Sequence, residues 1–211
     1  MFSPTLLYPK SPIFLLYLWR RYCKKQVIST LLSLVIGLSS CVQREKEAIT
    51  TNVESLKEHY TLLVRESNLW KSDSYLSSVK IDFEERGGKI FASFQSPSTA
   101  NESLQLVFNP ETNNITKEIF EHKVPILFHV PIFQSDWNLD SVDAMRSFLS
   151  YDDVRDLWLE SPGHCNDLGL RHFFVNDQWK LAWILTVSDC QTYTEYFYVD
   201  PKSGERLELV Y

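Results

Sequence analysis

The sequence predicts an α+β protein of two similar halves, each with one or more helices packed on an antiparallel β-sheet. Three observations predict this class. A stretch with helical periodicity over residues 49–67 precedes several runs that alternate apolar and polar residues. Clusters rich in Gly, Pro and Asn separate those runs, as turns do. The same order, a helical pattern and then β-like runs, returns 91 residues later.

The first half comprises residues 41–122 and begins with the predicted helix. Apolar residues spaced alternately four and three positions apart form one stripe on it: Ile49, Val53, Leu56, Tyr60 and Leu63. A strand follows, because Val79, Ile81 and Phe83 alternate with charged residues, which is typical of a strand with one solvated face. Turn residues, Gly87-Gly88 first among them, then separate three further predicted strands, over 89–95, 103–108 and 115–120.

The second half comprises residues 137–211 and follows a connecting segment, residues 123–136. Its helical pattern over 140–160 is predicted to break into two pieces, with Ser150 and Asp153 capping the second. Three strands are then predicted, over 168–175, 179–187 and 193–199, the first two joined as a hairpin by Asn176-Asp177-Gln178. With the offset of 91, the turn that begins at Asn109 aligns with the turn that begins at Asp200. This match in order and spacing predicts an internal duplication.

Charge is distributed unevenly along the chain. The first 40 residues contain five basic side chains and no acidic one, whereas the whole chain of 211 residues has a formal net charge of −6, so residues 41–211 carry −11. Nucleic acid and anionic lipid headgroups would repel such an acidic domain. We therefore expect no nucleic-acid partner.

An export signal is predicted over residues 1–40. Lys24 and Lys25 precede an apolar stretch over 27–38, and the small residues Ser39 and Ser40 follow it. A positive segment, about a dozen apolar residues and small residues at the end define a signal peptide.

The four residues Leu38-Ser39-Ser40-Cys41 resemble a bacterial lipobox. The resemblance implies that Cys41 receives a diacylglyceryl group, that the signal is removed before Cys41, and that the new amino group is acylated. Palmitate would then anchor the protein to a membrane of the cell envelope. Val42 resembles an outer-membrane address, on the periplasmic side or the surface, if the cell is Gram-negative. The alternative is a plain signal peptide with a cysteine near its cleavage site.

Cys165 and Cys190 are the only free thiols left after such processing. Export places them in an oxidising compartment, where a pair is expected to form a disulfide. If the hairpin turns at Asp177–Gln178, the two cysteines face each other at its open end. The alternative is a Cys–His nucleophile, since His164 adjoins Cys165 and His172 is near. Adjacent strand residues point to opposite faces, which disfavours that alternative.

The end of the chain resembles a known family. A helix followed by three antiparallel strands that ends in Tyr198-Val-Asp-Pro-Lys-Ser-Gly-Glu-Arg-Leu207 looks like the close of a PepSY domain, and the two halves together resemble a tandem of such domains. The resemblance implies a small secreted module associated with peptidase inhibition or cell-envelope binding. Separately, segment 150–162 is similar to the helix-to-strand step of small outer-membrane assembly lipoproteins, although Glu160 stands where that family usually has Gly.

The sequence predicts no catalytic residue, metal ligand or cofactor. It contains no H-E-x-x-H, C-x-x-C, G-x-S-x-G or Walker-type motif. An acidic run on the predicted helix, Asp152, Asp153 and Asp156, is interpreted as a solvated face. An enzyme is therefore the less favoured class.

Tyrosines in the second half favour a binding function. Tyr196 and Tyr198, with Tyr193 before them, are predicted to lie on a sheet face opposite Phe197, and exposed tyrosines suit protein or peptide contacts. The alternative is that these rings pack against the helix. We favour a non-catalytic, lipid-anchored envelope lipoprotein that binds a protein or peptide. An exported hydrolase or peptidase inhibitor is the competing function.

Overall fold

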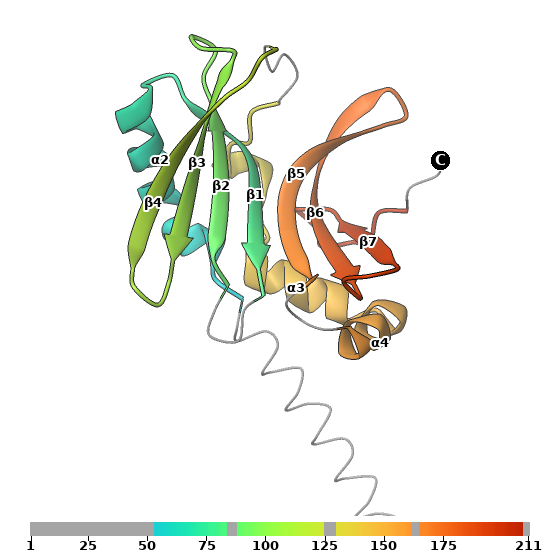
Figure 1. Cartoon of the computed structure of the whole chain (residues 1–211). Helices are drawn as coiled ribbons and strands as arrows, with labels where there is room; N and C mark the ends of the chain where they lie inside the picture. The colour runs from blue at the N-terminus through green and yellow to red at the C-terminus, as the bar shows by residue number, and fades with distance from the viewer. Residues whose placement is uncertain (1–52, 84–87, 125–129, 162–164, 209–211) are drawn as a thin grey trace, which may run out of the picture. The chain divides into compact units, whose positions relative to one another are not determined.

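Seven antiparallel strands form one continuous sheet in the order β4-β3-β2-β1-β5-β6-β7 (Figure 1). The structure, a computed structural model, describes residues 53–83, 88–124, 130–161 and 165–208. All of these belong to Ala48–Tyr211, the second of two compact units in the chain. Cys41 and the predicted signal peptide lie outside the described residues. The strands are β1 (Tyr75–Asp82), β2 (Ile90–Gln95), β3 (Glu102–Asn109), β4 (Asn114–Glu121), β5 (Asp167–Val175), β6 (Gln178–Ser188) and β7 (Thr194–Val199).

Two helices pack on the same face of the sheet. The described helices are α2 (Leu56–Trp70), the short 3-10 helix η1 (Gln134–Asp136), α3 (Ser141–Leu149) and α4 (Asp152–Glu160). α2 contacts β1, β2 and β3, whereas α3 contacts β6, β7 and the neighbouring α4. The predicted α+β class is therefore confirmed. Of the helices in the described ranges, none is both long and apolar enough to cross a membrane.

Ile49, the first residue of the stripe predicted for the first helix, lies outside the described residues, and the rest of the stripe is buried or half-buried. The described helix begins at Leu56, after Val53 of the stripe. Leu56 and Leu63 are buried, and so is Val53, which precedes the helix. Ser55 has an extended backbone, and its hydroxyl oxygen accepts a hydrogen bond from the backbone N–H of Glu58 at 3.2 Å. Ser55 is thus the N-cap, which fixes the start of the helix at the next residue.

The second helical stretch breaks in two, as predicted, but not through the predicted capping pair. Ser150 ends α3, and its hydroxyl donates to the carbonyl of Ser147 at 2.7 Å. Tyr151 occupies the N-cap position of α4. Asp153 pairs instead with Arg206, at 2.8 Å. The capping role predicted for Ser150 is therefore wrong.

β5 and β6 form the predicted hairpin, but its turn lies one residue earlier than predicted. Asn176 and Asp177 have φ values of 48° and 58°, and Val175 pairs with Gln178 across the turn. A two-residue turn with both residues left-handed matches the twist of the flanking strands, and Asn and Asp tolerate that conformation well. Gln178 therefore belongs to β6 and not to the turn.

Cys165 and Cys190 form the predicted disulfide, with their Cα atoms 5.5 Å apart. Their predicted place in the hairpin ladder is wrong. The register of β5 with β6, continued past the strand ends, sets Cys165 opposite Ser188. Cys190 lies two residues beyond β6, in a loop where its φ is 67°. Because Cys165 is bonded, it is not the free thiolate that the Cys–His alternative needs.

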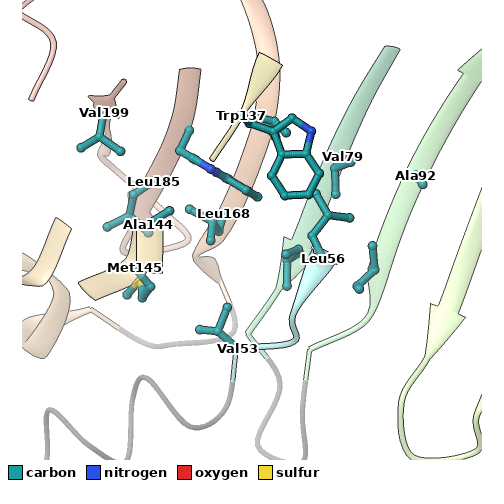
Figure 2. Packing of buried hydrophobic residues seen from close by; sticks show 14 of the residues in the cluster. Val53, Leu56, Val79, Ala92, Trp137, Ala144, Met145, Leu168, Leu185 and Val199 are labelled. Carbon is teal, nitrogen blue, oxygen red and sulfur yellow. The ribbon is translucent and has the colours of Figure 1, made fainter. Parts of the chain in front are cut away.

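One core lies between the helices and the covered face of the sheet (Figure 2). Trp137 and Trp183 are both buried and meet edge to face, with ring centroids 6.4 Å apart. Ile132, in the predicted connecting segment, is also buried, and its backbone N–H donates to the carbonyl of Leu76 at 2.8 Å. The described end of that segment is therefore part of the core.

The N-termini of α2 and α3 meet at Ser141, which is fully buried. The backbone N–H of Leu56 donates to Ser141 Oγ at 2.9 Å, and the Ser141 hydroxyl donates to the carbonyl of Glu54. Beside it, the backbone N–H of Lys57 donates to Asp140 Oδ1 at 3.0 Å. The start of one helix thus supplies hydrogen-bond partners that the start of the other needs.

The two predicted halves contribute to a single sheet. α2 precedes β1 to β4, and α3 and α4 precede β5 to β7. The halves join where β1 pairs with β5, with Val79 opposite Leu170. The sequence predicted a separate sheet in each half, whereas the structure has one sheet that both halves share.

Candidate functional site on the second face of the sheet

The second face of the sheet, against which none of the described helices packs, is hollowed at its centre. A cavity of about 540 Å³ opens there, and we call it the hollow. Its lining includes charged, apolar and aromatic residues, among them Lys80, Phe91, Gly169, Arg171, Ile184 and Tyr196. The volume lies in the range of about 300–1,000 Å³ that is usual for ligand sites.

A glycine at the centre of the sheet forms the floor of the hollow. Gly169 lies between Leu168 and Leu170, which are both fully buried on the covered face, so Gly169 faces the hollow. It pairs with Ile184 of β6. A Cβ added at Gly169 would lie 3.4 Å from the carbonyl oxygen of Val79, an ordinary contact. The backbone would thus accept a methyl group there, and the glycine leaves that space open.

Pairing across the strands arranges the second face in three rows. The middle row contains Phe91, Lys80, Gly169, Ile184 and Tyr198. The row on one side contains Ser93, Ser78, Arg171 and Ala182. The row on the other side contains Asp82, Asp167, Thr186 and Tyr196. One end of the hollow is therefore basic and the other is acidic.

Two charged groups in the hollow have partners, and a third has none among the residues that the structure describes. Lys80 Nζ lies 2.9 Å from Asp82 Oδ1. Asp167 accepts a hydrogen bond from the Thr186 hydroxyl at 2.9 Å. Arg171 is exposed, and within the described part of the chain no carboxylate lies within ion-pair distance of it. Its guanidinium is therefore available to a ligand.

The three tyrosines of the predicted binding face differ in position. Tyr196 is 50% exposed and lines the hollow. Tyr198 lies on the same face, partly buried, with its ring 5.1 Å from that of Phe173. Tyr193 precedes β7 and is held by its backbone in the loop after β6. Phe197, the residue between the other two, is the ring that packs in the helix-covered core.

Asp189 organises the loop that carries Cys190 and Tyr193. Its carboxylate accepts hydrogen bonds from the Thr192 hydroxyl and from the backbone N–H groups of Gln191, Thr192 and Tyr193. These bonds hold the pKa of Asp189 well below its ordinary value. Together with the disulfide, they fix the connection between β6 and β7.

A second cavity, of about 480 Å³, lies beside the end of the connecting segment, and its lining includes Asp136, His172 and Asp200. Burial lowers the pKa of His172, and its Nδ1 has no hydrogen-bond partner among the described residues. Within those same ranges, no group of three His, Cys, Asp or Glu side chains could hold a metal ion. His164, the other candidate of the Cys–His alternative, lies outside the described residues.

The acidic run on α4 is exposed. Asp152 pairs with Arg155 at 2.6 Å, and Asp153 pairs with Arg206 at 2.8 Å. These contacts are those of a solvated, ion-paired helix face.

Sequence patterns did not identify the central residues of the hollow. Lys80 is on β1, whereas Gly169 and Arg171 are on β5, so the three residues come from two strands far apart in the chain and form no motif. The one available signal was local: Gly169 and Arg171 alternate with leucines in a strand that is otherwise apolar at its start. That alternation places both residues on one face, but it does not say which strand lies beside them.

Comparison with known proteins bears on the fold. No family model matches the chain, and no curated protein matches its sequence. The crystal structure, at 1.85 Å resolution, of a protein named as a candidate lipoprotein from Clostridium difficile 630 is similar, with a TM-score of 0.50 and 12% sequence identity. The match covers 72% of this chain and 91% of that chain. Because the identity is so low, the similarity shows a shared fold alone.

Proposed function

We propose that the protein is a lipid-anchored lipoprotein of the cell envelope whose hollow binds another protein or a peptide without catalysing a reaction. The observation that carries this proposal is the hollow itself. It lies on a sheet face without a helix among the described residues. It is bordered by the exposed ring of Tyr196 and by the exposed guanidinium of Arg171, for which the described part of the chain offers no carboxylate at ion-pair distance. Tyr and Arg are residue types enriched where proteins bind partners.

Three features support the envelope location. Residues 38–41 resemble a lipobox. The Cys165–Cys190 disulfide is of a kind that persists in oxidising compartments. The similar fold belongs to a protein named as a candidate lipoprotein. In a Gram-negative cell, Val42 favours the outer membrane.

Palmitate labelling tests the anchor, with two cysteine variants as a matched pair. We expect the wild type and Cys23→Ser to be labelled and shortened, because Cys23 lies within the predicted signal peptide. Cys41→Ser should carry no label and keep its full length. Labelling of Cys41→Ser at the wild-type level would contradict the anchor.

Site-specific photo-crosslinking in intact envelopes tests the binding face. A photo-reactive amino acid at position 196 should form adducts with a partner, because this position lines the hollow. The matched control is position 195, where Glu195 is also exposed but points to the other face. Equal adduct yields at the two positions would show that the hollow is not the contact surface.

We also propose that residues 41–122 and 137–211 descend from one duplicated unit, joined by residues 123–136. Val79 and Leu170 are 91 residues apart and pair with each other where β1 meets β5. The same offset relates the two hairpins. Beyond the bulge in β1, adding 91 to both residue numbers of a β1–β2 pair gives a pair of the β5–β6 hairpin. The next pair of strands departs from this rule: the β6–β7 register differs by two residues from the β2–β3 register shifted by 91.

Alignment of homologous sequences tests the duplication. Comparing the residue preferences of the two halves should give the best match at an offset of 91. A better match at another offset, or none at all, would contradict common descent of the halves.

A further inference from the structure

The charge pattern of the hollow defines the kind of peptide that it can take. Arg171 is the group that decides this. Its neighbours on the same face, Ser78 on β1 and Ala182 on β6, are both small, so the guanidinium can be approached from the hollow. A planar guanidinium binds a carboxylate through two parallel hydrogen bonds, and this geometry is more specific than a contact with an ammonium group.

The opposite end of the hollow carries the complementary charge. Asp167 lies on the same face of β5 as Arg171, four residues away, and faces Asp82 of β1. At a rise of about 3.3 Å per residue, the backbones of Asp167 and Arg171 are roughly 13 Å apart. An extended peptide of about four residues spans the same distance. The two ends of the hollow thus match the two charged ends of a short peptide.

The row between these ends contains Lys80, whose ammonium group is paired with Asp82 at 2.9 Å, followed by Gly169 and Ile184. Gly169 contributes no side chain, and Ile184 is 2% exposed and forms part of the floor. Two aromatic rings also line the hollow: Phe91, in the row of Lys80, and Tyr196, in the row of Asp167. Aromatic rings of this kind offer contact area to the side chains of a bound peptide at small entropic cost.

We propose that the hollow binds a short, extended peptide with a free C-terminus, whose carboxylate is held by Arg171 and whose amino end lies toward Asp167. The inference rests on the binding function proposed above. It adds the polarity of the bound peptide and the terminal group that the site recognises.

Three pools of tetrapeptides test this inference by saturation-transfer NMR with the protein purified from envelopes. All pools contain random combinations of Ala, Leu, Phe and Ser. One pool has free termini, one is amidated at the C-terminus, and one is acetylated at the N-terminus. We expect the amidated pool to give a signal roughly tenfold weaker than the free pool, because it lacks the carboxylate that pairs with Arg171. The acetylated pool should be weakened by a smaller factor.

Two arginine variants give the matched comparison. Arg171→Gln should lower the signal of the free pool to that of the amidated pool. Arg146→Gln should leave it unchanged, because Arg146 is an exposed residue of α3, 62% exposed, on the helix-bearing side. Near-UV circular dichroism checks that both variants fold. If Arg171→Gln does not fold, the comparison of the free and amidated pools on the wild-type protein tests whether the site recognises a carboxylate.

Each outcome separates this inference from the function on which it rests. Equal signals from the free and amidated pools would overturn the role of Arg171 and leave peptide binding in place. If no pool binds while adducts still form at position 196, the peptide inference is overturned and the protein-binding function stands. If neither is seen, both are overturned.

Discussion

Ser141, the first residue of α3, is a single residue that links the starts of two helices. It accepts a hydrogen bond from the Leu56 N–H and donates one to the Glu54 carbonyl, both at the N-terminal end of α2. Ser141→Ala should lower the free energy of unfolding by about 1–3 kcal/mol, because it leaves buried backbone groups without a partner. Urea unfolding measures this. Ser72→Ala, at an exposed turn residue, is the control and should change little. Equal effects of the two substitutions would contradict the role of Ser141.

Asp189 should make stability depend on pH in a defined direction. Its pKa in the folded protein lies below the ordinary value of 3.8, so the ionised form stabilises the fold. That contribution is present above pH 3.8 and is lost as the pH falls below it. Asp189→Asn should therefore lower the Tm at pH 7, and the difference from the wild type should shrink only below pH 3.8. Thermal unfolding followed by circular dichroism at a series of pH values checks this, and a constant difference across that range would contradict it.

At this scale the sequence predicted the face of Tyr196 but not the role of Arg171. Side chains alternate along a strand, so a buried Phe197 is enough to place Tyr196 on the other face. Whether a charged side chain has a partner depends on the neighbouring strand. β5 lies beside β1, and the sequence pattern contains no signal for that pairing.

At the scale of elements, the Cys165–Cys190 disulfide closes a loop that contains the β5–β6 hairpin. Replacing both Cys165 and Cys190 with serine should lower the free energy of unfolding by about 3 kcal/mol, since the bond closes a loop between residues 25 apart in sequence. Urea unfolding without reductant measures the change. The reduced wild type is the control and should unfold like the double variant. An unchanged midpoint would show that the bond does not stabilise the fold.

Elements were predicted better than their ends. Apolar periodicity identified the first helix, but its start is set by the hydroxyl of Ser55, a local hydrogen bond that periodicity does not contain. The hairpin was predicted, but its turn was placed one residue late. Asn176 and Asp177 both accept a left-handed backbone, and a two-residue turn of that kind fixes the register.

At the scale of the whole molecule, the α+β class and the order of elements followed from the sequence, whereas the single sheet did not. Alternation of apolar and polar residues reveals faces, and it does not reveal which strands are neighbours. The pairing of β1 with β5 merges the strands of both halves. That merger also brings Gly169 beside Lys80 and so creates the hollow, which is why the site emerges only from the assembled fold.

Filling the hollow tests most directly whether it is the binding site. Gly169→Leu would occupy the space above the floor, whereas Gly169→Ala adds one methyl group for which the backbone has room. The yield of adducts formed by a photo-reactive residue at position 196 in intact envelopes, measured beside the Tm of each variant, gives the answer. We predict that Gly169→Leu folds and loses at least about tenfold in adduct yield, while Gly169→Ala keeps most of it. A folded Gly169→Leu variant with undiminished yield would contradict binding in the hollow.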